Sequence, residues 1–366
     1  MMSVNKKLTT LVIGDIHFKS DTVSDGAKFV NNIIEIAEKE DPSFIVLLGD
    51  ILDTHEIVNV QPYKIATLLI EELSKIAPLY IIIGNHDLIN HTQFLTDNHA
   101  FNPFKRWDNV FVADKPLLHT FKDSEGYDKV FTFCPYVQPG RFIEALKHEH
   151  EEEWESSYAI FAHQEFKGCS MNKITSNQGD VWDEELPPVI SGHIHDEQIV
   201  GDNIFYTGSS IQNSYSESPN KKVWLINWEP PIGEDIYYEN GFSVKKIKVG
   251  MRPKYLKNFT IDELLDKSKT DAFINSLKTS DIKIKLSGSS QEFKVFRTSE
   301  IYKLITNNKF NVKFSYNLVE DNPQSDSVIE RLQREDLSFR KIFKDLVVEQ
   351  SNSVKGEYNE LFDNEL

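Results

Sequence analysis

A repeated unit in the first half of the chain constrains the fold more than any other feature of the sequence. Apolar runs of strand length at Leu8–Ile13, Phe44–Leu48 and Leu79–Ile83 are separated by helix-like stretches at Ala27–Glu38 and Pro62–Ile76. Short apolar strands that alternate with helices are typical of βαβ units, whose strands form a parallel or mixed sheet buried on both faces. The sequence therefore predicts an α/β fold.

The second half of this region continues the pattern. Apolar runs at Tyr158–Ala162 and Pro188–Ser191 are followed by strand-like pieces at Ile204–Thr207 and Val223–Trp228, which together indicate a second sheet. Most of these runs end in a polar residue. Because ligands of open α/β sheets bind at the carboxyl ends of the strands, we expect these polar residues to converge on one site.

The length of 366 residues exceeds the roughly 250–300 residues at which a single core stops growing, so we expect more than one domain. A linker is predicted at Glu229–Glu234, and the first domain at residues 1–240. Residues 241–318 are predicted to form a small α/β cap domain, and residues 319–366 a linker, an amphipathic helix and an acidic tail.

Charge is unevenly distributed along the chain. The net charge is −17, yet Lys245–Lys313 holds 16 Lys and Arg against 7 Asp and Glu. A solvated charged face is the simpler interpretation of this basic segment, and binding of a polyanion is the alternative. Cys134 and Cys169 are expected to be packed side chains without redox chemistry. With neither a secretory leader nor a membrane-spanning run, we expect a cytoplasmic protein, in the host cytoplasm if a virus or phage encodes it.

Side chains that bind hard divalent cations follow the predicted strands in order. Carboxylate, amide and imidazole groups of this kind suit a pair of ions bridged by one shared ligand. In Asp-x-His and His-x-His, both side chains lie on the same side if the segment is extended. Each of these residues alone is weak evidence for a metal site. Their recurrence, in order, after successive predicted strands is much stronger evidence. The candidates are Asp15, His17, Asp50, Asn85, His86, His163, His193 and His195.

This order of Gly-Asp-x-His, Gly-Asp-x-x-Asp, Gly-Asn-His-Asp, His and Gly-His-x-His resembles the calcineurin-like metallophosphoesterases over roughly residues 8–228. The resemblance implies a β-sandwich flanked by helices and two divalent ions that neutralise a phosphate ester and activate water. It implies that Asp50 bridges the ions and that His86 is catalytic without being a ligand. The implied ligands of the first ion are Asp15, His17, Asp50 and His195, and those of the second are Asp50, Asn85, His163 and His193.

Within this superfamily the chain is most similar to the SbcD-type nuclease subunits of double-strand-break repair complexes, including those of tailed phages. Asn109–Pro116, Tyr206–Ser209 and the cap support this resemblance. It implies an exonuclease or single-strand endonuclease of DNA recombination and repair, with manganese, or else magnesium, as the metal. It further implies a homodimer with an SMC-like ATPase partner and no membrane association.

The resemblance also suggests residues that contact the substrate and the partner. Asp53 stands where many cellular members have a histidine, and the nearby His55 is a candidate to replace it. Lys283 and Lys285 are expected to bind the DNA backbone. The apolar face of the helix at Leu337–Val348 is expected to dock on the ATPase or, alternatively, on its own cap. Its anchors are Phe339, Ile342, Phe343 and Leu346.

Three other functions compete with a nuclease. A phosphoprotein phosphatase is disfavoured because the chain reads Asp53-Thr54 and Gly84-Asn85-His86-Asp87 where that class has Asp-Arg-Gly and Gly-Asn-His-Glu. A phosphodiesterase of cyclic nucleotides or other small diesters shares every ligand, but it does not explain the basic segment. A non-catalytic scaffold is disfavoured because every ligand position is filled.

Overall fold

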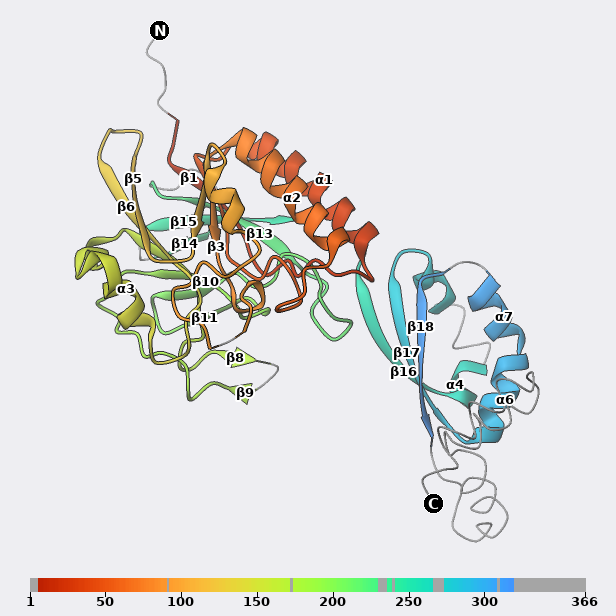
Figure 1. Cartoon of the computed structure of the whole chain (residues 1–366). Coiled ribbons are helices and arrows are strands. Elements are labelled where there is room, and N and C mark those ends of the chain that lie inside the picture. The colour runs from red at the N-terminus through yellow and green to blue at the C-terminus, as the bar shows by residue number, and fades with distance from the viewer. Residues whose placement is uncertain are drawn as a thin grey trace, which may run out of the picture. The chain divides into compact units, whose positions relative to one another are not determined.

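The computed structural model describes residues 6–90, 92–171, 174–229, 236–238, 241–265, 273–307 and 310–318. These residues form two compact units, which are described separately (Figure 1). The first unit holds the described residues up to Leu256 together with Ser276–Lys283, and the second holds the others. The predicted helix at Leu337–Val348, with its four candidate anchors, and the acidic tail lie outside the described residues.

The first unit is a sandwich of two mixed sheets. One sheet has seven strands in the order β14-β15-β13-β1-β2-β3-β4, with β1 to β4 parallel. The other has six strands in the order β11-β12-β10-β7-β6-β5. The bounds in the first sheet are β14 Ile236–Tyr238, β15 Phe242–Lys248, β13 Lys222–Asn227, β1 Thr9–Ile13, β2 Phe44–Leu47, β3 Leu79–Ile82 and β4 Val110–Ala113. Those in the second sheet are β11 Gln198–Val200, β12 Ile204–Tyr206, β10 Val189–Gly192, β7 Ala159–His163, β6 Asp128–Cys134 and β5 Leu117–Lys122.

Aromatic side chains fill the space between the two sheets. Tyr80 of β3 stacks on Phe133 of β6 with ring centroids 4.1 Å apart, and Phe133 stacks in turn on Phe161 of β7 at 5.3 Å. Phe44 of β2 contacts the same cluster. These four residues belong to an apolar core cluster with contributions from both sheets. Alternate residues of the strands are therefore buried on the opposite face, where helices cover them.

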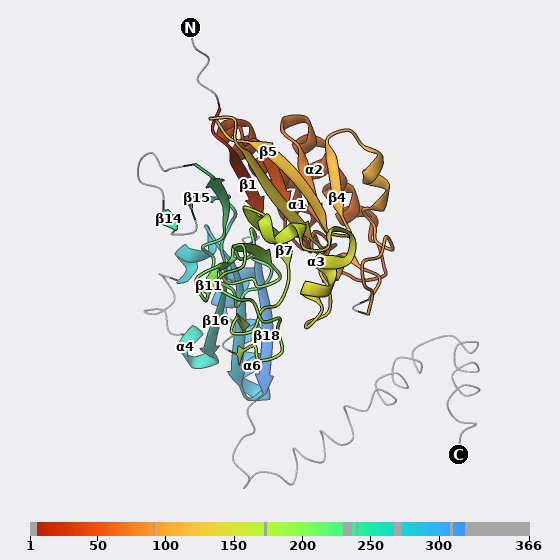
Figure 2. The same ribbon diagram turned by 90° about the vertical axis from the view of Figure 1, so that its left-hand side faces the viewer.

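Helices cover the outer faces of the sandwich. Helices α1 (Val23–Glu40) and α2 (Val60–Ile76) lie side by side against the first sheet, and both Figures 1 and 2 show them together. Helix α3 (Phe142–His150) packs on the second sheet. Short 3₁₀ turns at Asn85–Asp87, Asn102–Arg106 and Glu153–Ser156 and a small hairpin of β8 (Ser170–Met171) and β9 (Ile174–Thr175) complete this unit. The predicted β-sandwich flanked by helices is confirmed.

The first sheet extends past residue 240, where the sequence suggested a domain boundary. Strand β15 pairs antiparallel with β13 from Lys222↔Lys248 to Asn227↔Ser243, so this sheet continues to Lys248. Glu229 is also part of this unit, because its carboxylate accepts hydrogen bonds from the backbone N–H groups of Leu8 (2.8 Å) and Ser124 (2.9 Å). The rest of the predicted linker, residues 230–234, lies outside the described residues.

A three-stranded sheet in the order β16-β17-β18 follows, with bounds β16 Lys254–Thr260, β17 Asp281–Gly288 and β18 Val312–Leu318. Helices α4 (Ile261–Leu265), α6 (Ser290–Thr298) and α7 (Glu300–Asn307) accompany it. Figure 1 shows α6 and α7 on one face, and Figure 2, turned by 90°, looks onto the other. On β17, Ile284 and Leu286 are buried, whereas Lys283 is half-buried and Lys285 is exposed. The two lysines thus share the face that is not turned to the core.

Helices long and apolar enough to cross a membrane were sought in the described part of the chain, and none was found.

Candidate metal centre

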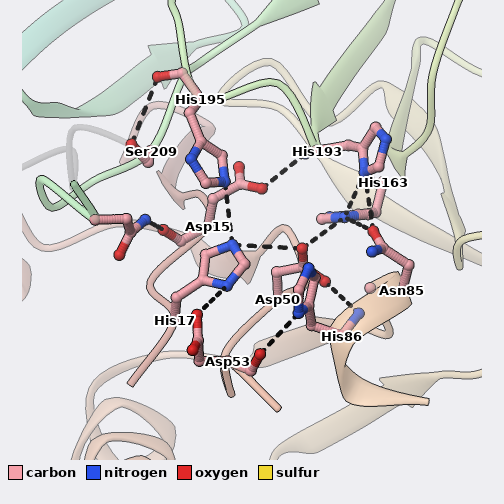
Figure 3. A network of polar contacts seen from close by, with 12 residues as sticks. Asp15, His17, Asp50, Asp53, Asn85, His86, His163, His193, His195 and Ser209 are labelled. Atoms are coloured by element: carbon pink, nitrogen blue, oxygen red, sulfur yellow. Dashed lines mark hydrogen bonds and ion pairs between the residues drawn. The ribbon is translucent and has the colours of Figure 1, made fainter. Parts of the chain in front are cut away.

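Five candidate ligands lie at the carboxyl ends of strands from both sheets of the sandwich (Figure 3). Asp15, Asp50 and Asn85 follow β1, β2 and β3 of the first sheet. His163 ends β7 of the second sheet, and His193 follows β10. All five are buried or nearly so. The site therefore lies along the edge where the two sheets meet, as expected for residues at the ends of parallel strands.

The side chains form three overlapping groups in which the potential ligand atoms lie within 4.8 Å of one another. Asp50 belongs to two of these groups, and its Oδ2 lies 3.4 Å from both His17 Nε2 and His163 Nε2. The groups are Asp15, His17 and His195; His17, Asp50 and His86; and Asp50, His163 and His193. Asn85 joins the third group, because its Oδ1 lies 2.9 Å from His193 Nδ1. The geometry thus provides two sets of ligands that share Asp50.

Tight turns position four of these residues. Asp15, His17, Asp50 and His193 all have positive φ angles, of 45°, 49°, 49° and 79°. Residues with a side chain rarely adopt this left-handed conformation, and it costs of order 1–3 kcal/mol each. Both members of Asp-x-His and of His-x-His reach the site, but the expectation that these segments are extended is wrong. The backbone instead turns sharply after the strands, and a bond from His17 N–H to the Asp50 carbonyl (2.8 Å) joins two of the turns.

Outward hydrogen bonds set the tautomers of three histidines. Nδ1 of His163 lies 2.6 Å from the Leu48 carbonyl, that of His86 lies 2.8 Å from the Asp53 carbonyl, and that of His195 lies 3.2 Å from a carboxylate oxygen of Glu217. Because these oxygens only accept hydrogen bonds, each Nδ1 carries the proton. Each Nε2 is then available for the centre of the site, which is how metal-binding histidines are oriented by their outer partners.

Histidine nitrogens from different loops lie close together inside the site. His17 Nε2 lies 3.1 Å from His195 Nε2, and His193 Nδ1 lies 3.3 Å from His163 Nε2. Asp15 Oδ2 is buried and accepts no hydrogen bond from any described residue. A cation bound among these groups would satisfy the orphaned oxygen. The residues therefore fit divalent metal ions, whose preferred ligands are of these types.

The charges of the site agree with this fit. Burial opposes ionisation of Asp50, yet the neighbouring His163 and His17 rings hold the pKa of Asp50 well below its usual range. Burial also opposes protonation of His163, but Asp50 raises the pKa of His163 to about 9, so a cation bound there would have to displace the proton on Nε2. The pKa of His193 falls to about 3, because burial and the nearby His163 both disfavour its charged form. Asp50 is thus an anionic group that would attract a cation, and a neutral His193 is able to act as a ligand.

Two residues that the sequence analysis did not single out support the site. Asp87 joins the second and third loops: its carboxylate accepts hydrogen bonds from the N–H groups of Ile51 (3.1 Å), Leu52 (3.1 Å) and Gly84 (3.0 Å). Glu217 orients His195, as described above. Asp87 could have been recognised as the last residue of the Gly-Asn-His-Asp motif, whereas Glu217 has no motif of its own.

The predicted substrate residues fall in two places. Asp53 lies beside the metal groups, with a carboxylate oxygen 3.4 Å from His17 Nδ1 and 3.0 Å from Lys19 Nζ. His55 stacks on His86, with ring centroids 4.5 Å apart and planes at 21°. Lys283 and Lys285 lie on β17, in the three-stranded sheet.

Gly84 is predicted to be indispensable for steric reasons. A Cβ atom at this position would lie 2.3 Å from both the backbone N and Oδ1 of Asp50, so Gly84→Ala must displace Asp50. The φ of Gly84 is −86°, which any residue adopts, so the effect would arise from the clash alone. We expect the free energy of unfolding to fall by at least the roughly 1–3 kcal/mol of an overpacked core, together with loss of metal affinity. Chemical denaturation and metal titration measure both.

Gly126→Ala is the control for this substitution. Gly126 also lies in the first unit, and a Cβ atom there would meet nothing within 4 Å. Its φ of +91° alone predicts a cost of about 1 kcal/mol. Equal destabilisation by the two variants, with metal affinity unchanged in both, would contradict the packing of Gly84 against Asp50.

The family model and the two relatives found by comparison with known proteins agree on a phosphoesterase family. The family model described as calcineurin-like phosphoesterase matches residues 8–262. "Putative phosphoesterase 078R" of Invertebrate iridescent virus 3 is 35% identical over 317 residues, covering 86% of this chain and 86% of that protein. The similarly named 244L of Invertebrate iridescent virus 6 is 39% identical over 294 residues, covering 80% and 98%. A solved dimetal phosphatase from Danio rerio is 12% identical, covers 67% of this chain and 97% of its own, and has a TM-score of 0.43.

Proposed function

This chain belongs to the calcineurin-like phosphoesterase family, and we propose that it is a two-metal nuclease that hydrolyses phosphodiester bonds of DNA. The observation that carries the phosphoesterase chemistry is the position of Asp50 between two sets of metal-binding side chains. Bound there, two divalent cations would neutralise the charge of the phosphate diester and favour ionisation of the attacking water. Whether the diester is DNA or a small molecule depends on residues outside this centre.

His86 is proposed to assist departure of the leaving oxygen. Its Nδ1–H is held by the Asp53 carbonyl, so the ring presents Nε2 for proton transfer. Its backbone N–H donates to Oδ1 of Asp50 at 2.8 Å, which fixes the ring beside the shared ligand. When Nε2 also carries a proton, the imidazolium can transfer that proton to the alkoxide as it leaves.

The lysine face of β17 supports a polyanionic substrate. Lys283 and Lys285 lie on the face of the strand away from its buried Ile284 and Leu286, within a segment where Lys and Arg outnumber Asp and Glu by 16 to 7. Binding of a phosphate backbone to such a face releases counterions, which makes the affinity dependent on salt. A solvated face that binds nothing remains the alternative, and the two are separated by the following measurement.

Charge reversal at both positions, Lys283→Glu with Lys285→Glu, is expected to weaken DNA binding. The slope of log K against log salt should become shallower by about 0.7–0.9 for each phosphate that the variant no longer neutralises. Hydrolysis of a small diester should not change. The matched control is Lys294→Glu with Lys303→Glu, which reverses two exposed lysines on α6 and α7. A slope equal to that of the unsubstituted protein would show that the β17 lysines form a solvated face.

One assay distinguishes a nuclease from a small-diester phosphodiesterase. End-labelled single- and double-stranded DNA is incubated with Mn²⁺ or Mg²⁺, in parallel with bis-p-nitrophenyl phosphate. A nuclease degrades the labelled strands and shows which metal it prefers. Hydrolysis of the small diester without any cleavage of DNA would overturn the nuclease proposal and favour the alternative, which shares the same metal ligands.

The finer properties implied by the SbcD-type resemblance remain predictions. The two curated relatives are named only as phosphoesterases, so DNA repair, manganese, the homodimer and the SMC-like ATPase partner rest on the resemblance alone. The helix anchors Phe339, Ile342, Phe343 and Leu346, proposed to bind the ATPase, lie outside the described residues. Co-purification of the chain with such an ATPase, before and after removal of residues 335–366, tests that proposal.

A further inference from the structure

A cavity of about 370 Å³ opens beside His86, and none of the other candidate metal ligands lines it. Two loops form it, one after β2 and one after the 3₁₀ turn at Asn85–Asp87. Its apolar wall includes Val58 and Ile89, whose side chains remain 47% and 40% exposed. Large apolar side chains left open to solvent next to a reacting group indicate a surface that binds something.

The charges around this cavity differ from those on the other sides of the centre. Among the described residues that line it there is no Lys or Arg, and Glu56 and Asp97 contribute carboxylates. By contrast, the hollow along His17 includes Lys19 and Lys254. The hollow along His195 includes Lys221 and Lys222. A phosphate is therefore disfavoured in the cavity beside His86 and favoured on the lysine-lined sides.

We propose that this cavity, which we call the base pocket, binds the nucleobase of the nucleotide whose sugar carries the leaving oxygen of the scissile phosphate. The inference rests on the proposed function, because it takes His86 as the group that faces the leaving oxygen. A substituent on that oxygen extends past His86 and into the base pocket, whose wall His86 forms.

A nucleobase matches the chemistry of the base pocket. It is planar and uncharged, so its faces can pack on Val58 and Ile89. Its ring edge carries amino and imino groups that can donate hydrogen bonds to Asp97 or Glu56, and Asn98 offers both a donor and an acceptor. Bases read in this way are first unstacked from their neighbours, which single-stranded DNA allows at little cost. The phosphates on either side then stay out of the pocket, toward the lysines.

The test uses single-stranded oligonucleotides that carry one stable abasic residue at a defined position. Cleavage is mapped under single-turnover conditions at the two bonds that flank this residue. We expect cleavage to slow by about tenfold or more at the bond whose leaving oxygen belongs to the abasic residue, the effect of emptying an apolar specificity pocket. The other flanking bond should be cut at close to the normal rate.

Variants connect this difference to the base pocket. Val58→Gln with Ile89→Gln should make the natural bond nearly as slow as the abasic one, with the affinity for Mn²⁺ and the rate at the abasic bond unchanged. Ile199→Gln is the matched control, because Ile199 is an aliphatic side chain of similar exposure (51%) that does not line the pocket. The Ile199→Gln variant should cleave the natural bond faster than the abasic bond by the same factor as the unsubstituted protein.

The failure of this inference is distinguishable from failure of the nuclease proposal. If DNA is cut but both bonds flanking the abasic residue are cleaved at equal rates, the base pocket does not bind a leaving-side base. The same conclusion follows if only the opposite bond slows, or if the double variant keeps its discrimination. If no oligonucleotide is cut while the small diester is hydrolysed, the nuclease proposal itself is wrong.

Discussion

Replacement of Asp50 by Asn is expected to abolish binding of both metal ions and, with it, hydrolysis. The amide keeps the size of the side chain but removes its negative charge, and Asp50 Oδ2 is equidistant, at 3.4 Å, from the histidine nitrogens of the two ligand sets. The loss of affinity should exceed the roughly 10–100-fold that results when only an outer partner of a ligand is removed. Calorimetric titration with Mn²⁺ or Mg²⁺ measures the affinity and number of ions.

The comparison for this variant is Asp128→Asn, the same chemical change on a side chain of β6 that is 62% exposed. It should bind two ions like the unsubstituted protein. Two ions bound by Asp50→Asn with unchanged affinity would show that Asp50 is not the shared ligand. Loss of only one ion would assign Asp50 to a single set.

His86→Ser is expected to keep the metal ions and lose turnover, by roughly 10²–10⁴-fold if the ring acts as a general acid. Asn85, the proposed ligand next to it, already has Oδ1 close to His163 and His193. The His86 ring nevertheless lies in one potential metal-binding group with His17 and Asp50, so the assignment needs a direct test. Metal titration and single-turnover cleavage, measured on the same preparation, separate the two roles.

His148→Ser serves as the reference, because His148 is 42% exposed on α3 and lies outside all three potential metal-binding groups. Its metal content and rate should be normal. If His86→Ser loses an ion together with its activity, His86 is a ligand. A normal rate with both ions bound would remove it from the chemistry altogether.

Much of the sandwich could be predicted from the sequence, because its central strands are recognisable from their local amino-acid pattern. Phe44–Leu47 and Leu79–Ile82 are buried on both faces and therefore read as continuous apolar runs between helices. Strand β15 was not assigned to the first domain, because Lys245, Lys246 and Lys248 make its sequence resemble the basic segment that follows. Its pairing with β13 is a long-range interaction that local composition does not encode.

The identities of the site residues were more predictable than their geometry. The motifs placed each residue at the end of a strand, and the chain brings them together there. The left-handed turns at Asp15 and His17 were not predictable: Asp and His adopt positive φ more often than most residues, but still in only a small minority of cases, and here the surrounding structure imposes it. Glu217 was missed for a similar reason: it lies 22 positions after His195, beyond β11 and β12, with no spacing rule to indicate the contact.

The position of the centre along the edge of both sheets has a consequence for the stability of the whole sandwich. Asp15, Asp50 and Asn85 belong to one sheet and His163, His193 and His195 to the other, so an ion held by both sets is a cross-link between the layers. His17 and His195 are 178 residues apart in the chain, and the unfolded polypeptide offers no comparable site. By mass action, an ion at about 100 times its dissociation constant adds roughly 2.7 kcal/mol to the folded state. The cations proposed to take part in hydrolysis would then also stabilise the packing of the two sheets against each other.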